Sequence, residues 1–156
     1  MEEQIFGMEH IMLDQPLQSR DQIFTALASK GEELGAAEME GDILEGILER
    51  EAMSTTNVGR GVAIPHCKSI KIKKTTLLFI RLQKPVEWEG DEEKVKLVFG
   101  ILTPSNTANT HLSILSKLAK SLLRDDFVQK LLELDETELV LKEINQTIAV
   151  KESYSL

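Results

Sequence analysis

The sequence is 156 residues long, 42% hydrophobic and 28% charged, with a formal net charge of −8. This length fits a single domain with a sizeable core, and the acidic balance argues against nucleic acid as a partner, because phosphates require clustered lysines and arginines. A single cysteine, Cys67, excludes an internal disulfide, and no apolar run approaches the ~20 residues of a membrane span. The first residues lack the layout of a signal peptide, so we expect a cytoplasmic protein that inserts in no membrane.

The first forty residues predict a strand followed by a helix. Residues 10–13 form a short apolar run that favours a strand, and we expect His10 to lie on the surface. The run Ser-Arg-Asp-Gln at 19–22 fits the capping box that starts a helix. Apolar residues then recur with helical spacing as far as Gly35, which is a suitable stop for the helix.

A second helix is predicted over 39–52, and its last turn carries two charges on the buried side. The apolar face of this helix is formed by Ile43, Leu44, Ile47 and Leu48. At about 100° per residue, Arg50 lies beside this stripe and Glu51 lies near its middle. Because an unpaired buried ion costs several kcal/mol, each charge needs a partner. Either the two charges pair at the helix end, or Arg50 is held ready for an anion.

The stretch around Pro65 predicts a histidine at the end of a strand. Gly59-Arg60-Gly61 favours a tight turn, and the apolar residues 62–64 are enough for a short buried strand. Pro65 withholds its backbone donor and ends the pairing, so 67–69 is expected to be a polar loop. His66 would then lie where open α/β sheets keep their reacting groups. The alternative is a histidine that only caps the strand.

Another histidine, His111, lies in the first turn of a predicted helix. It shares one face with Leu115, Leu118 and Leu122, because the four are spaced i, i+4, i+7 and i+11. The unpaired N–H groups and the dipole of a helix start favour anions and a neutral imidazole ring. The alternative is a core histidine with satisfied hydrogen bonds.

The rest of the second half predicts two strands and two more helices. These are strands over 75–82 and 95–102, and helices over 125–134 and 135–148 that each begin with an aspartate cap. A turn over 85–91 contains Trp88, which we expect to pack over the sheet. The alternation of strands with amphipathic helices predicts an α/β fold. We expect one domain over 1–150 and a polar C-terminal tail over 151–156.

Taken together, these motifs resemble the enzyme IIA domains of the fructose/mannitol class of the bacterial sugar phosphotransferase system. The resemblance is carried by Arg50-Glu51, Thr56, the run Val62-Ala63-Ile64-Pro65-His66 and the helix from Thr110 to Ala119, and it extends over 10–147. It implies a mixed sheet of four or five strands flanked by helices on both faces. It assigns no definite role to Thr56, and it requires no cofactor.

The resemblance also implies a phosphoryl relay between proteins. His66 would accept the group from the phosphohistidine of the carrier protein HPr and pass it to a cysteine of an enzyme IIB domain for sugar uptake. His111 would donate hydrogen bonds to the phosphoryl oxygens, and Arg50 would offset their charge or hold a carboxylate of the site. Imidazole suits this role because it is nucleophilic when neutral. The absence of a P-loop motif argues against direct use of ATP.

Three other hypotheses remain open at this point. The first is a regulatory enzyme IIA of the nitrogen-related kind, whose phosphorylation state controls a protein partner and which carries the same Pro-His site. The second is a metal site, although the histidines and the cysteine lack the spacing of metal ligands. The third is a cysteine hydrolase that uses Cys67 and His111, although Cys67 lies in no recognisable nucleophile motif.

Overall fold

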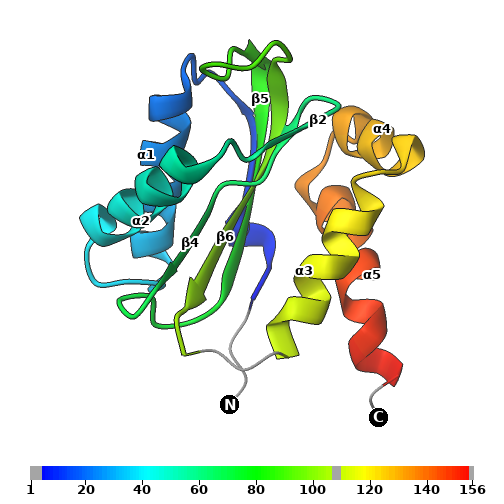
Figure 1. Cartoon of the computed structure of the whole chain (residues 1–156). Helices are drawn as coiled ribbons and strands as arrows, with labels where there is room; N and C mark the ends of the chain where they lie inside the picture. The colour runs from blue at the N-terminus through cyan, green and yellow to red at the C-terminus, as the bar shows by residue number, and fades with distance from the viewer. Residues whose placement is uncertain (1–4, 107–109, 155–156) are drawn as a thin grey trace. The chain divides into compact units, whose positions relative to one another are not determined.

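The computed structural model describes the backbone of residues 5–106 and 110–154 and the side chains of residues 5–106 and 116–148 (Figure 1). The chain divides into two units, Met1–Asn106 and Thr107–Leu156. The first unit contains the sheet with two α-helices, and the second contains three α-helices. The expected α/β class is therefore confirmed.

A mixed sheet forms the centre of the first unit. The elements of this unit are η1 (Met8–His10), β1 (Ile11–Gln15), α1 (Arg20–Glu33), α2 (Glu40–Met53), β2 (Asn57–Gly59), β3 (Val62–Ala63), β4 (His66–Ser69), β5 (Thr76–Val86) and β6 (Val95–Pro104). The strand order is β1-β5-β6-β3-β2, with β4 also paired to β6. β5 is antiparallel to β6, whereas β1 is parallel to β5 and both β3 and β4 are parallel to β6. The predicted mixed sheet is confirmed, with six strands because β3 and β4 are separate segments.

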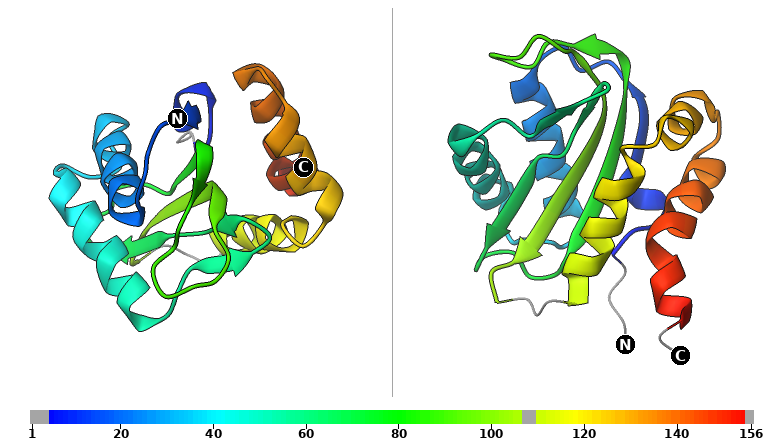
Figure 2. Two further views of the ribbon diagram at one scale, coloured as in Figure 1. Left: turned by 90° about the horizontal axis from the view of Figure 1, so that it is seen from above. Right: turned by 45° about the vertical axis from the view of Figure 1, so that its right-hand side comes forward.

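Helices α1 and α2 lie side by side over one face of this sheet (Figures 1 and 2). Alternate residues of β5 point to that face, as the two-residue period of a strand requires. The core between the helices and the sheet is apolar and includes Phe24, Leu27, Ile43, Ile47, Leu78, Ile80 and Val98. The expected helices on the other face stay a prediction, because they would come from the second unit.

The ends of α1 follow the signals in the sequence. Ser19 Oγ accepts a hydrogen bond from the Gln22 N–H at 3.1 Å, as a capping residue does. Only half of the expected capping box forms, because Gln22 Oε1 accepts from the N–H of Gln18 at 2.7 Å instead of that of Ser19. Gly35, with a φ of 84°, ends the helix as predicted.

Pro65 interrupts the strand but does not end it. The expected loop over 67–69 is wrong, since these residues belong to β4 and continue the parallel pairing with β6. The pairing continues past Pro65 because proline lacks an N–H but keeps its carbonyl group. Pro65 O accepts a hydrogen bond from the Ile101 N–H at 3.0 Å. The Gly59-Arg60-Gly61 turn is confirmed, with positive φ at all three residues. His66 therefore begins a strand segment just after a break.

The β5–β6 hairpin runs further than the sequence predicts. Pro85 was expected in a turn but lies in β5, and Val86 pairs with Val95 beyond it. The pairing of β1 with β5 ends at Leu82. Past that point β5 has a free edge within the described sheet, where a proline costs no ladder hydrogen bond.

His10 is buried, and its expected surface position is wrong. The side chain is only 3% exposed and packs beside the ring of Phe6, with ring centroids 5.9 Å apart. Its Nδ1 accepts a hydrogen bond from the Gly7 N–H at 2.9 Å. Burial is the main influence that lowers the pKa of this ring below its ordinary value of 6.5.

We expect His10 to make the fold sensitive to mild acid. Because its pKa is lowered in the folded state, the unfolded chain takes up the proton first, so the stabilisation is present above pH 6.5 and declines as the pH falls below it. The slope from one such group is at most about 1.4 kcal/mol per pH unit. Urea unfolding at pH 7.5 and 5.5 should show a smaller loss for His10→Asn than for the wild type. Equal losses in the two proteins would contradict this prediction.

Within its described residues, the second unit consists of helices and the segments that connect them. It consists of α3 (Thr110–Ser121), α4 (Asp125–Glu133) and α5 (Thr137–Tyr154), and α3 packs against α5. The expected aspartate caps are wrong, because Arg124 occupies the N-cap of α4 and α5 begins two residues after Asp135. The domain boundary expected at residue 150 stays a prediction. The helix α5 continues beyond that residue. Among the described residues, no helix has both the length and the apolar character needed to cross a bilayer.

Candidate functional site

His66 is held by one hydrogen bond at each ring nitrogen. Its Nδ1 lies 2.8 Å from the carbonyl oxygen of Ile64, two residues earlier in the chain. Because a carbonyl oxygen can only accept, Nδ1 carries the proton and Nε2 carries the lone pair that accepts a hydrogen bond. The ring is half-buried at the start of β4. The carbonyl of Ile64 therefore favours the tautomer with the proton on Nδ1.

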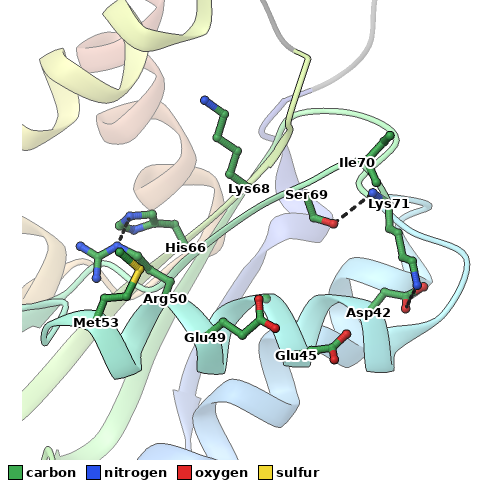
Figure 3. Close-up of a pocket in the computed structure, with 11 residues that line it drawn as sticks. Asp42, Glu45, Glu49, Arg50, Met53, His66, Lys68, Ser69, Ile70 and Lys71 are labelled. Carbon is green, nitrogen blue, oxygen red and sulfur yellow. Dashed lines mark hydrogen bonds and ion pairs between the residues drawn. The ribbon is translucent and has the colours of Figure 1, made fainter.

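Arg50 on the last turn of α2 reaches the other ring nitrogen. Its Nε donates to His66 Nε2 at 3.1 Å (Figure 3). Its Nη1 donates to the carbonyl oxygen of Ser54 at 2.9 Å. Two residues that lie sixteen positions apart in the sequence therefore meet, as the resemblance implies. The alternative in which Arg50 pairs with its neighbour at the helix end is wrong, because Glu51 points elsewhere.

Glu51 is a buried carboxylate with three hydrogen-bond donors. It is 8% exposed and accepts from the Thr56 N–H at 2.9 Å, from Thr56 Oγ1 at 2.6 Å and from Trp88 Nε1 at 2.9 Å. These contacts give Thr56 a place in the site that the sequence did not reveal. They also show that Trp88, expected only to pack over the sheet, has a polar contact as well. The sequence signal for these contacts was the charge of Glu51 within the apolar stripe of α2, because a buried charge requires partners.

A groove of about 330 Å³ lies between α2 and β4, next to His66. Figure 3 shows the acidic residues on the α2 wall, with Lys68 outside it and the side chain of Lys71 reaching Asp42, where Nζ lies 3.3 Å from Oδ1. The lining residues are Asp42, Glu45, Gly46, Glu49, Arg50, Met53, His66, Lys68, Ser69, Ile70 and Lys71. Two of them are strongly exposed apolar side chains, Met53 at 81% and Ile70 at 83%. Both side chains therefore offer accessible apolar surface beside His66.

Cys67 is buried behind the site and faces α2. Its side chain is 1% exposed and contacts the backbone of Gly46 so closely that a Cβ there would overlap its sulfur. Burial, with Glu49 and Asp42 nearby, raises the pKa of the thiol to about 11. Such a thiol stays protonated near neutral pH, whereas the thiolate is the nucleophile. This argues against the cysteine-hydrolase alternative.

His111 lies in the first turn of α3, as its spacing predicts. Its side chain lies outside the described residues, and so does any contact that it makes. The expected approach of His111 to His66 therefore stays a prediction. Within the part of the chain whose side chains are described, no three residues of the metal-ligating types gather at one point.

Comparison with protein families gives a match over nearly the whole chain. Residues 4–147 match the family described as "Phosphoenolpyruvate-dependent sugar phosphotransferase system, EIIA 2". The fructose-specific EIIA component of the phosphotransferase system of Haloferax volcanii is 34% identical over 137 residues, which make up 87% of this chain and 89% of that protein.

Proteins with a regulatory name are similar too. A nitrogen regulatory protein of Bradyrhizobium diazoefficiens is 40% identical over 114 residues, or 72% of this chain and 74% of its own. The crystal structure of nitrogen regulatory protein IIA-Ntr from Neisseria meningitidis is 31% identical, with a TM-score of 0.83 over 90% of this chain and 96% of that one. Other relatives are longer, and the chain spans 16% of the multiphosphoryl transfer proteins that it matches.

Proposed function

Because the chain belongs to the EIIA 2 family of the phosphoenolpyruvate-dependent sugar phosphotransferase system, whose domains transfer phosphoryl groups between proteins, we propose that His66 is the residue that carries the group. The observation that supports this most is the pair of hydrogen bonds at the His66 ring. They leave Nε2 as the nucleophilic nitrogen and place a cation beside it.

The transfer would take place in two steps at this ring. Nε2 of His66 attacks the phosphorus of the donor phosphohistidine, and the donor's nitrogen takes back the electron pair of the N–P bond as it breaks. The proton on Nδ1 remains in place, bonded to Ile64 O, which stabilises the positive charge on the phosphorylated ring. In the second step a thiolate of the acceptor attacks the phosphorus, and Nε2 recovers its electron pair.

Arg50 would change partner during the first step. In the resting protein its Nε–H donates to the lone pair that must react. As the phosphoryl group arrives, its oxygens are stronger acceptors than a neutral nitrogen, so the guanidinium turns to them. Phosphoryl transfer depends mainly on positioning and on stabilisation of charge, and Arg50 would supply both. His111 would add hydrogen bonds to the same oxygens.

The partners in this proposal are proteins. The donor is HPr and the acceptor is an enzyme IIB domain, as the family resemblance implies. An open groove rimmed by the exposed side chains of Met53 and Ile70 suits two proteins that must reach His66 in turn. The acidic wall of α2 would attract basic side chains on either partner.

We assign the chain to sugar uptake, with nitrogen-type regulation as a second candidate. The similarity to the fructose-specific component supports uptake, and it covers most of both proteins. The similarity to nitrogen regulatory proteins supports regulation. Offering the phosphorylated chain to a fructose-class IIB domain separates the two roles. Transfer to the IIB cysteine is expected for uptake, and a phosphoryl group that stays on the chain would favour regulation.

Labelling with phosphorylated HPr tests the proposal itself. We expect one phosphoryl group per chain, located on Nε2 of His66 by ³¹P and ¹⁵N spectroscopy. The variant His66→Gln should take up no label, whereas the matched control His10→Gln should be labelled like the wild type. Label on another residue, or normal labelling of His66→Gln, would overturn the proposal.

A further inference from the structure

One buried carboxylate is connected to the hydrogen-bond partners of both His66 ring nitrogens, although it does not bond to His66 itself. The carboxylate belongs to Glu51, which is 8% exposed. Ile64 bonds to Nδ1 of His66 and Arg50 bonds to Nε2. Two separate sets of contacts connect Glu51 to these two partners.

The first set is a continuous series of hydrogen bonds. Glu51 accepts from both the N–H and the hydroxyl group of Thr56. The carbonyl oxygen of Thr56 accepts from the Ile64 N–H at 2.9 Å. The carbonyl oxygen of Ile64 then accepts from His66 Nδ1. A displacement of Thr56 would therefore move the acceptor that holds the His66 ring.

The second set acts through the loop after α2. Arg50 Nη1 donates to the carbonyl oxygen of Ser54. Ser54 lies in the short segment between Glu51 and Thr56, whose two ends are joined by the bonds of the carboxylate. Closing this segment fixes the Ser54 carbonyl and, with it, the direction of the Arg50 guanidinium.

Trp88 ties this carboxylate to the core. Its Nε1 donates to the same Glu51 oxygen as the Thr56 N–H, and its indole is 1% exposed. The indole meets the ring of Phe24 edge-on, with centroids 5.6 Å apart and an angle of 79°. Three donors converge on one acceptor group, so an apolar side chain in its place would leave all three unsatisfied.

We propose that Glu51 is a positioning residue for phosphoryl transfer. Through Thr56 and Ile64 it holds His66 in the Nδ1–H tautomer, and through Ser54 it directs the Arg50 guanidinium. The catalytic part of this inference rests on the proposed function. The tautomer part does not, because it concerns the unphosphorylated ring. The geometry, and not the negative charge, is what matters: glutamine can keep an oxygen for the two N–H donors and offer its amide to the Thr56 hydroxyl.

The test compares four variants of the whole chain under conditions in which circular dichroism shows each to be folded. Glu51→Met removes the acceptors at nearly constant volume, and Glu51→Gln is the conservative variant. Thr56→Val removes one donor of the path. Thr76→Val is the matched control, since Thr76 is equally buried and its hydroxyl donates only to Lys74 O among the contacts described. Ring ¹⁵N shifts of His66 at pH 8.5, where an ordinary imidazole is neutral, and the rate of labelling by phosphorylated HPr are measured.

We expect Glu51→Met to mix the two His66 tautomers and to slow labelling at least tenfold. Thr56→Val should change both in the same direction by about fivefold in rate, and Glu51→Gln and Thr76→Val should resemble the wild type. If Glu51→Met does not fold, Thr56→Val decides. A wild-type tautomer and rate in the folded Glu51→Met or Thr56→Val variant would overturn the inference. A shifted tautomer without labelling of the wild type would support Glu51 as the residue that sets the ring and overturn the proposed function instead.

Discussion

Replacing Arg50 with alanine is expected to slow the phosphorylation of His66 by about a hundredfold. The reason is that its guanidinium contacts the nitrogen that we propose reacts, and removal of one preorganised donor from a site of developing charge costs about 10²–10³ in rate. The side chain is half-buried, its bond to Ser54 is exposed and its bond to His66 is only partly buried, so the fold should survive. The measurement is a rapid-quench rate with phosphorylated HPr in excess.

Two further variants show whether the effect belongs to this arginine. Arg50→Lys keeps the charge but loses the planar fork that reaches both His66 and Ser54, so its rate should lie between those of the wild type and Arg50→Ala. Arg124→Ala removes an exposed arginine at the start of α4 and changes the net charge equally. It should react at the wild-type rate. An equal loss in Arg50→Ala and Arg124→Ala would mean that only overall charge matters.

Gly46→Ala is expected to lower the free energy of unfolding by about 1–2 kcal/mol, although alanine favours a helix more than glycine by about 1 kcal/mol. A Cβ at this position would overlap Cys67 Sγ and lie 3.2 Å from Cys67 Cβ. The cysteine is fully packed in the core, so α2 or β4 must shift, and such overpacking costs about 1–3 kcal/mol. Urea denaturation measures the change.

Gly41 in the same helix provides the matched control. A Cβ at Gly41 would meet no atom within 4 Å, so Gly41→Ala should leave the stability unchanged or raise it. The double variant Gly46→Ala/Cys67→Ala should recover part of the loss, because the overlapping sulfur is gone. Equal effects of the two glycine substitutions would show that α2 is not in close contact with β4 at Gly46.

The sequence was sufficient for most of the helices and for the long strands of the sheet, and it indicated two residues that meet in the candidate site. Apolar periodicity and the signals at Ser19 and Gly35 predicted α1, and apolar runs predicted β5 and β6, because these features act over a few neighbouring residues. Arg50 and His66 were predicted through a family resemblance, and the structure brings them within 3.1 Å. His111 stays a prediction.

The remainder depended on contacts between distant parts of the chain. The partner of Glu51 at Trp88 lies 37 residues away, and no local pattern indicates such a pair. Pro65 predicts the end of a strand, because its missing donor is visible in the sequence whereas the bond from the Ile101 N–H to its carbonyl is not. Likewise, the sequence does not predict the burial of His10, because only the folded turn brings Phe6 and Gly7 around it.

The Arg50–His66 contact has a consequence for selectivity. In the unmodified protein the lone pair of Nε2 is already engaged with the guanidinium. An uncharged electrophile must break that contact and supplies no new hydrogen-bond acceptor for Arg50. A negatively charged electrophile supplies a stronger acceptor for the guanidinium at the moment of attack. Discrimination in favour of anionic reagents is thus present in the ring's immediate surroundings before any partner docks.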